Sequence, residues 1–176
     1  MTKKHIICFN PKGGVGKSTW CERIAIELLR LGHSVSVENT DQQVHMELRQ
    51  DDGADFCLYD TMGAYSAKNM ELLAAASGDD VDALIIVPTG TSKNDFKDID
   101  FLKSQLEKHD LLDKTIFVFT KVRKNSQSLI KRRLQLDSLG FKHCKYTMPS
   151  LEDFSEERNT PRTRNEVSQF LNEVIL

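Results

Sequence analysis

Apolar and polar residues along this chain form two kinds of segment. Short apolar runs, such as HIICFN at 5–10, are typical of strands that are buried on both faces. Longer stretches repeat apolar residues at helical spacing, as Ile24 and Leu28 do before the helix-ending Gly32. The pattern predicts strands at 5–10, 34–38, 55–60, 82–87, 115–120 and 143–147, and helices at 18–31, 65–76, 94–108, 127–139 and 166–175.

The order of these elements predicts a doubly wound α/β fold. Strands that alternate with helices form a mostly parallel sheet with helices on both faces. Pro88 is expected to end the fourth strand, and Pro161 to precede the last helix. The charged segment 152–164 reads as a solvated connection. At 176 residues, the chain is expected to form one domain over residues 1–176.

Composition narrows the classes of function. The net charge of -2 excludes a chain that attracts DNA or membranes as a whole, so any such role needs a local patch. The cysteines form no C-x-x-C pair, and no apolar run is long enough to span a membrane or to form a signal sequence. We expect a reduced, cytoplasmic protein without a zinc or iron–sulfur site; the four cysteines are Cys8, Cys21, Cys57 and Cys144.

A glycine-rich segment, KGGVGKST at 12–19, lies between the first strand and the first helix. This is the context that a phosphate-binding P-loop requires. The glycines let backbone N–H groups converge on phosphate oxygens, and the helix start adds a positive dipole end. Lys17 is positioned to neutralise the β- and γ-phosphates, and Ser18 to offer its hydroxyl to Mg²⁺. The alternative is a chance glycine-rich turn.

The same segment resembles the deviant Walker A box of the ParA/MinD superfamily of P-loop NTPases. Pro11 stands where the standard pattern has glycine, and Lys12 is the additional lysine that marks this box. The resemblance implies that Lys12 reaches across an ATP-bound homodimer to the partner's phosphates and takes part in catalysis with Lys17. The nucleotide-binding residues of the box are then Lys12, Gly13, Gly14, Val15, Gly16, Lys17, Ser18 and Thr19.

Two acids at predicted strand ends match the family's acidic motifs. Asp60 resembles the Walker B aspartate and is expected to hold Mg²⁺ together with Ser18. Asp41 matches the family's second aspartate, which serves hydrolysis. Asn39 replaces the first aspartate, and Met62 replaces a proline of the following switch. The resemblance therefore implies slow or partner-stimulated hydrolysis and a looser switch.

The residues that follow the fifth strand bear on the choice of base. Arg123 stands where a GTP-binding N-K-x-D box has aspartate, which favours ATP. The resemblance assigns Thr120, Lys121 and the loop 148–150, with Pro149 at its centre, to the adenine pocket.

Residues 121–145 carry eight Lys or Arg and one acid, Asp137. ParA-like ATPases bind DNA without sequence preference once ATP makes them dimerise, and a patch of this kind would contact phosphates. A solvated basic face is the alternative. The candidate DNA-binding residues are Lys124, Lys131, Arg132 and Arg133.

The resemblance is nearest to the compact plasmid partition and plasmid-stability or conjugation ATPases, such as the StbB or TraL kind. It implies ATP and Mg²⁺ as cofactors, and a homodimer that is associated with the nucleoid when ATP is bound. It also implies a plasmid-encoded adaptor or centromere-binding partner. The tail at 166–176 contains no lysine or arginine, so membrane anchoring is not expected. Two other functions remain open: an ATP-binding adaptor with little hydrolysis, and a small-molecule kinase on a P-loop scaffold.

Overall fold

The computed structural model describes residues 3–40, 48, 53–150 and 152–176. In this part of the chain, six parallel strands form one sheet in the order β2-β3-β1-β4-β5-β6. This confirms the predicted fold class. The strands are β1 (Lys4–Cys8), β2 (Val35–Asn39), β3 (Phe56–Asp60), β4 (Ala83–Thr89), β5 (Thr115–Thr120) and β6 (Lys142–Met148).

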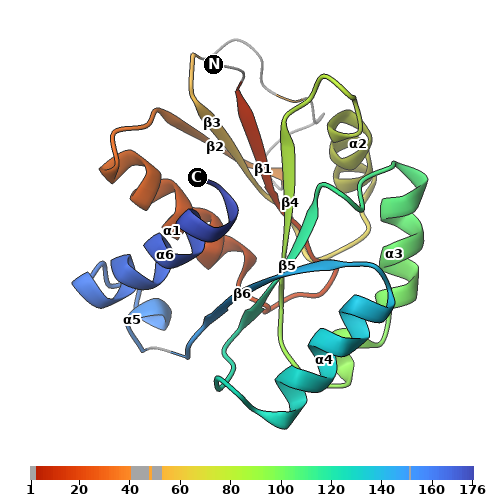
Figure 1. Cartoon of the computed structure of the whole chain (residues 1–176). Coiled ribbons are helices and arrows are strands. Elements are labelled where there is room, and N and C mark those ends of the chain that lie inside the picture. Colours follow the sequence, from red (N-terminus) through yellow and green to blue (C-terminus); the bar gives the residue numbers. More distant parts are fainter. Residues whose placement is uncertain (1–2, 41–47, 49–52, 151) are drawn as a thin grey trace.

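Helices cover both faces of the sheet (Figure 1). The first and last helices pack on one face, and the three middle α-helices pack on the other. The described helices are α1 (Lys17–Arg30), α2 (Ala67–Ala76), η2 (Asn94–Phe96), α3 (Ile99–Lys108), α4 (Gln127–Ser138), α5 (Glu152–Ser155) and α6 (Pro161–Val174).

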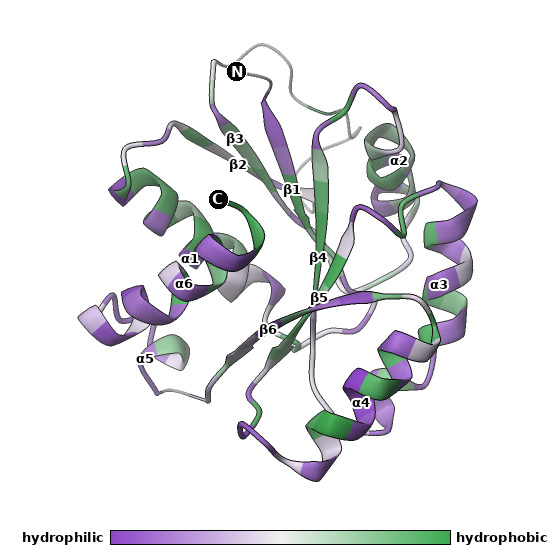
Figure 2. Ribbon diagram, in the orientation of Figure 1, coloured by the Kyte–Doolittle hydropathy of each residue, from purple (hydrophilic) through white to green (hydrophobic). Residues whose placement is uncertain are grey.

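Each face of the sheet forms its own hydrophobic core, because the strand side chains alternate between the two faces. Figure 2 shows the apolar residues on the strands and on the inward sides of the helices. Trp20 of α1 is fully buried and lies 4.8 Å from the ring of Phe170 of α6 and 6.0 Å from that of Tyr146 of β6. These rings join α1 to α6, so the helix that follows the glycine-rich loop rests on a rigid support.

The expectation that Pro88 ends the fourth strand is wrong, because β4 continues to Thr89. Pro88 follows the last paired residue of β4 on the β1 side, where Cys8 aligns with Ile86. Its carbonyl accepts a hydrogen bond of 2.8 Å from the Asn10 side chain on that side. The missing N–H of the proline therefore costs the sheet no ladder bond, and β4 still pairs with β5.

The segment after β6 is more ordered than the sequence predicted. Residues 152–164 contain the short helix α5 and the first turn of α6, rather than only a solvated connection. Pro161 is the first residue of α6, where its missing N–H is not needed. The Thr160 side chain accepts a hydrogen bond from the Thr163 N–H, and the Thr163 hydroxyl receives one from the Thr160 N–H. This capping box starts the helix five residues earlier than expected.

Three strand ends meet beside the start of α1. Cys8, Asn39 and Asp60 are aligned across β1, β2 and β3 at the carboxyl edge of the sheet. In open α/β sheets, ligands bind at this edge. The parallel register therefore brings Asp60 and Asn39 to the level at which the glycine-rich loop leaves β1.

Candidate nucleotide site

The glycine-rich loop joins β1 to α1 and has the backbone geometry of an anion cradle. Gly16 precedes the helix with φ 95° and ψ 22°, and Gly14 has φ 74°. Residues that carry a side chain rarely adopt this left-handed backbone conformation, so glycine is needed at these positions. A Cβ built on Gly13, Gly14 or Gly16 would meet nothing within 4 Å, so the loop borders open space at the helix N-terminus.

Lys17 lies inside the loop and is only 7% exposed. Its Nζ donates a hydrogen bond of 2.9 Å to the carbonyl oxygen of Lys12, which closes the loop on itself. Burial lowers the pKa of Lys17, while the nearby charges of Asp60 and Cys8 act in the opposite direction. A bound phosphate would supply the negative charge that this buried ammonium group needs.

Asp60 ends β3 beside Cys8, the last residue of β1, and its negative charge acts to raise the pKa of Lys17. Ser18 follows Lys17 in the chain, and it is exposed at the helix start. A hydroxyl, a carboxylate, phosphate oxygens and water form an oxygen donor set of the kind that Mg²⁺ prefers. Ser18 and Asp60 therefore fit the expected magnesium site. The described residues contain no cluster of three or more His, Cys, Asp or Glu side chains that would hold a metal without a nucleotide.

Hydrogen bonds join the segment after Asp60, residues 61–64, to β1, to Thr40 and to α2. Thr61 donates to the Cys8 carbonyl at 2.8 Å, and the Met62 N–H donates to the Thr40 hydroxyl at 3.1 Å. The buried Asn69 side chain donates to the carbonyls of Met62 and Ala64 at 3.0 and 2.7 Å. These hydrogen bonds restrain the segment where the resemblance, through Met62, implied a looser switch.

The residues assigned to the adenine pocket do come together. A cleft of about 480 Å³ lies beside Gly16 and Thr19 and is lined by Thr120, Lys121 and Pro149. Thr120 also donates a hydrogen bond of 3.0 Å to the Val15 carbonyl, which joins the end of β5 to the phosphate loop. The sequence did not predict the wall of this cleft that α5 provides through Glu152, Phe154 and Ser155, because residues 152–164 read as solvated.

The two residues expected to control hydrolysis differ in how they can be placed. Asp41 lies outside the described residues. Asn39 ends β2 in register with Asp60, and it is exposed. An amide therefore stands at the carboxyl edge where the resembled family has a carboxylate.

The structure divides the candidate DNA-binding residues into two pairs. Lys124 and Lys131 are exposed, on the β5–α4 connection and on the first half of α4. Arg132 and Arg133 instead contact the protein itself. Arg132 donates to the Thr91 carbonyl at 3.1 Å and lies 4.7 Å above the Phe96 ring.

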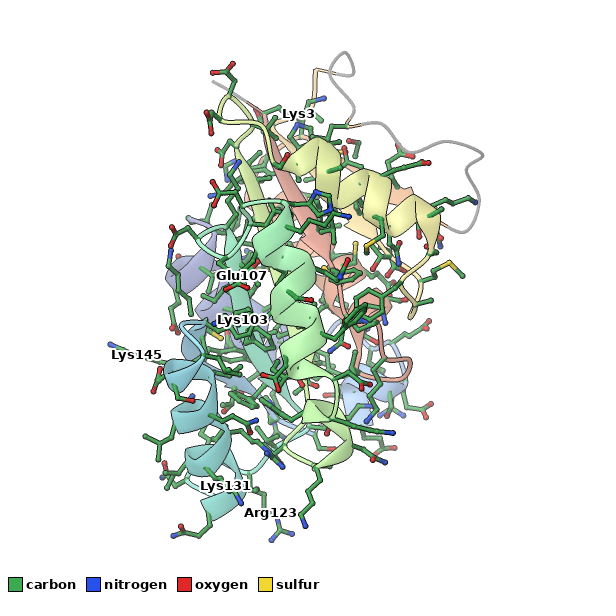
Figure 3. The ribbon with its side chains drawn as sticks, turned by 90° about the vertical axis from the view of Figure 1, so that its right-hand side faces the viewer. Lys3, Lys103, Glu107, Arg123, Lys131 and Lys145 are labelled. Carbon is green, nitrogen blue, oxygen red and sulfur yellow. The ribbon has the colours of Figure 1, made fainter. Side chains whose placement is uncertain are left out.

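Arg133 contacts the edge strand β6, where it donates to the carbonyls of Cys144 and Lys145 at 3.3 and 2.8 Å. Figure 3 shows Arg123 and Lys131 near each other at the lower end of the molecule, with Lys145 well above them. The basic stretch therefore extends from the lower end of the molecule to a cavity of about 650 Å³ that Lys124, Arg133 and Lys145 line together.

One residue of the site was missed by the sequence analysis. Asp95, on η2, accepts a hydrogen bond from Lys12 Nζ at 2.5 Å. The two residues are 83 positions apart, and no motif joins them. Only the fold shows that the segment after β4 lies against the glycine-rich loop.

The parallel sheet, the cradle between β1 and α1, and the aspartate at the end of β3 define a P-loop nucleotide-binding domain. The sequence profile of the CobQ/CobB/MinD/ParA nucleotide-binding domain family matches residues 6–161, and the chain belongs to this family. This confirms the predicted resemblance. No curated protein sequence matches the chain.

Solved structures share the fold at low sequence identity. A protein from Borrelia burgdorferi B31 assigned to plasmid partition, bound to AMPPNP, has a TM-score of 0.70 at 14% identity, over 98% of this chain and 99% of that chain. The MinD cell division protein of Aquifex aeolicus has a TM-score of 0.66 at 15% identity, over 98% of each chain.

A third neighbour is cobyrinic acid a,c-diamide synthase from Mycobacterium smegmatis, with an ATP analogue and magnesium. It has a TM-score of 0.64 at 13% identity, over 97% of this chain and 95% of that chain. At these identities the neighbours establish the fold of the chain and not its role. Among the described helices, none is long and apolar enough to cross a membrane.

Proposed function

We propose that this protein binds Mg-ATP in the loop between β1 and α1, dimerises around it, hydrolyses it slowly, and serves the partition, positioning or transfer of plasmid DNA. The observation that carries this proposal is the presence of two lysines on one phosphate loop. Lys17 is buried inside the loop, while the Lys12 side chain is 41% exposed and directed away from it. One ammonium group suffices to hold the phosphates within a subunit, so the second, which pairs with Asp95 in this structure, is left for a partner's phosphates once it leaves Asp95.

The cleft beside Thr19 and Thr120 supports the choice of adenine. It is lined by apolar atoms of Met148, Pro149 and Phe154 together with hydroxyl and backbone groups. A flat base can stack in such a cleft while its edge forms hydrogen bonds. A guanine would lack the carboxylate with which GTP-binding proteins recognise its ring, because Arg123 stands at that position.

Sedimentation velocity tests the dimer. With Mg²⁺ and AMPPNP, the protein is expected to shift from monomer to dimer, while ADP leaves it monomeric. Lys12→Ala is expected to bind the nucleotide and stay monomeric, because its phosphate loop keeps Lys17. A Lys12→Ala variant that dimerises as well as the wild type would contradict the proposal.

The exposed basic residues support a DNA-contacting surface at the carboxyl edge of the sheet. Lys124 follows Arg123 on the β5–α4 connection, and Figure 3 shows Lys131 of α4 near Arg123 at the same end of the molecule. Arg132 contacts Thr91 and Phe96, so the segment that carries the exposed Lys93 and Lys97 lies against α4. Exposed lysine and arginine side chains of this kind would bind DNA phosphates whatever the base sequence.

A paired substitution tests this surface. Lys124→Gln with Lys131→Gln is expected to reduce the slope of log affinity against log salt by about 1.8, because two phosphate contacts are lost. Lys108→Gln with Lys142→Gln is the matched control, since it also removes two positive charges, at the end of α3 and at the start of β6 on the opposite edge of the sheet. Equal effects of the two changes would rule out a localised surface.

An ATP-binding adaptor remains a second candidate, and Asn39 favours it. The amide of Asn39 lies level with Asp60, where it adds no negative charge to the magnesium shell. Phosphate release separates the two functions. If DNA and a partner extract stimulate phosphate release, the protein is an ATPase. If the dimer formed with ATP lasts as long as the dimer formed with AMPPNP, the protein is an adaptor.

A further inference from the structure

Lys12 is bound within its own subunit. Its Nζ lies 2.5 Å from Oδ1 of Asp95, and this carboxylate belongs to the segment between β4 and α3. The Lys12 backbone is fixed as well, because its N–H donates to the Asn10 side chain at 2.9 Å. Asn10 in turn donates to the Pro88 carbonyl, so the loop and the end of β4 are joined below the ion pair.

The position of Asp95 is itself determined by its surroundings. Its Oδ2 accepts hydrogen bonds from the Ser92 N–H at 2.9 Å and the Ser92 hydroxyl at 2.6 Å. A Cβ at Gly90 would collide with this carboxylate, so a side chain at residue 90 would displace Asp95 from its present position. Burial raises the pKa of Asp95, but the hydrogen bonds from Lys12 and Ser92 together hold it below its ordinary value.

Lys12 and Asp95 line a cavity of about 280 Å³ between the phosphate loop and α3. Tyr65 and Asp98 also line this cavity. The Asp95 side chain is 12% exposed, so its charge is poorly solvated, whereas the Lys12 side chain is 41% exposed and reaches it from the solvent side. Asp95 therefore depends on Lys12 for its counterion more than Lys12 depends on Asp95.

We infer that Asp95 is a positioning residue that holds Lys12 inside the monomer and sets the threshold for nucleotide-dependent dimerisation. This inference rests on the proposed function, in which Lys12 crosses to the partner's nucleotide. In the proposed function, Lys12 Nζ leaves Asp95, which lies 2.5 Å away in its own subunit, in order to reach a phosphate in another subunit. Dimerisation therefore breaks one Lys12–Asp95 pair in each subunit, and the phosphates must attract the two lysines more strongly than the two carboxylates do.

The expected effect is moderate. A partly exposed ion pair changes an equilibrium by about threefold. Each dimer releases two such pairs, so removing both changes the dimerisation constant by the square of this factor, about tenfold. The effect also weakens as salt is raised, because mobile ions screen the pair.

Asp95→Asn tests the inference, because asparagine keeps an oxygen for Ser92 and removes the charge that faces Lys12. With Mg²⁺ and AMPPNP, Asp95→Asn is expected to dimerise at about tenfold lower protein concentration than the wild type. The difference between these two concentrations should become smaller at high salt. Asp98→Asn is the matched control, since it removes the same charge from the same cavity without touching Lys12. An equal gain in Asp98→Asn would overturn the inference and assign the effect to net charge.

Labelling of Lys12 tests the contact in the absence of a dimer. Without nucleotide, an amine-reactive ester should modify Lys12 faster in Asp95→Asn than in the wild type or in Asp98→Asn, as measured by mass spectrometry of the peptide. Equal labelling rates in all three proteins would overturn the inference.

The two proposals fail in different ways. If AMPPNP produces a dimer with the same constant in the wild type and in Asp95→Asn, only the role of Asp95 is wrong. If neither protein dimerises at any concentration, the proposed function is wrong, and the threshold role of Asp95 fails with it.

Discussion

Replacing Gly63 with alanine should force the switch segment away from the phosphate loop. A Cβ on Gly63 would lie 2.9 Å from the backbone nitrogen of Gly13, 3.0 Å from its Cα and 3.1 Å from the carbonyl carbon of Lys12. All three neighbours are backbone atoms, so no side chain can rotate out of the way. Relief requires a shift of one segment by about half an ångström, a change comparable to overpacking by one methyl group.

Hydrogen bonds resist this shift on the switch side, since Asn69 holds the carbonyls of Met62 and Ala64. We therefore expect Gly63→Ala to lower the free energy of unfolding by about 1–2 kcal/mol, measured by urea denaturation without nucleotide. Gly13→Ala is the control, because its Cβ would meet nothing within 4 Å, and its stability should stay within about 0.5 kcal/mol of the wild type. Wild-type stability of Gly63→Ala would refute the close approach of the two segments.

Three further outcomes are expected, all measured by urea denaturation. Trp20→Ala should cost about 3–5 kcal/mol, because the buried indole fills the space between Phe170 and Tyr146, whereas Trp20→Phe should cost far less. Arg132→Ala should cost about 1–2 kcal/mol through its lost contacts with Thr91 and Phe96, whereas Lys131→Ala should leave stability unchanged. A hydrogen bond from Arg30 lowers the pKa of Glu27 in the folded protein. Ionised Glu27 therefore stabilises the fold above about pH 4.3, and this stabilisation is lost as the pH falls through the pKa of Glu27 in the folded protein. Glu27→Gln should remove this part of the pH dependence of the free energy of unfolding.

The strands and most helices could be predicted from the sequence because their apolar patterns are local. The strand expected at 115–120 has these bounds in the structure. Proline was the main source of error, since its effect depends on where its missing N–H points. Pro88 faces a side on which β1 has already ended, and Pro161 occupies the first turn of α6. Neither fact can be read from the neighbouring residues.

The candidate site was predictable to the extent that it is contiguous in the sequence. The phosphate loop and Asp60 follow strands that the pattern identifies. The Lys12–Asp95 pair joins segments that only the sheet order brings together. The roles within the basic stretch could not be predicted for a related reason: lysines and arginines look alike in a charge count, but Arg132 and Arg133 contact carbonyl groups of their own chain.

Calorimetric titration with nucleotide tests the phosphate site most directly. In the presence of Mg²⁺, AMPPNP is expected to bind the wild-type protein at one site per subunit. Lys17→Ala is expected to lose this binding, because Lys17 provides the buried positive charge of the loop. No heat of binding in the wild type, or equal binding by Lys17→Ala, would contradict the assignment of the β1–α1 loop as the nucleotide site.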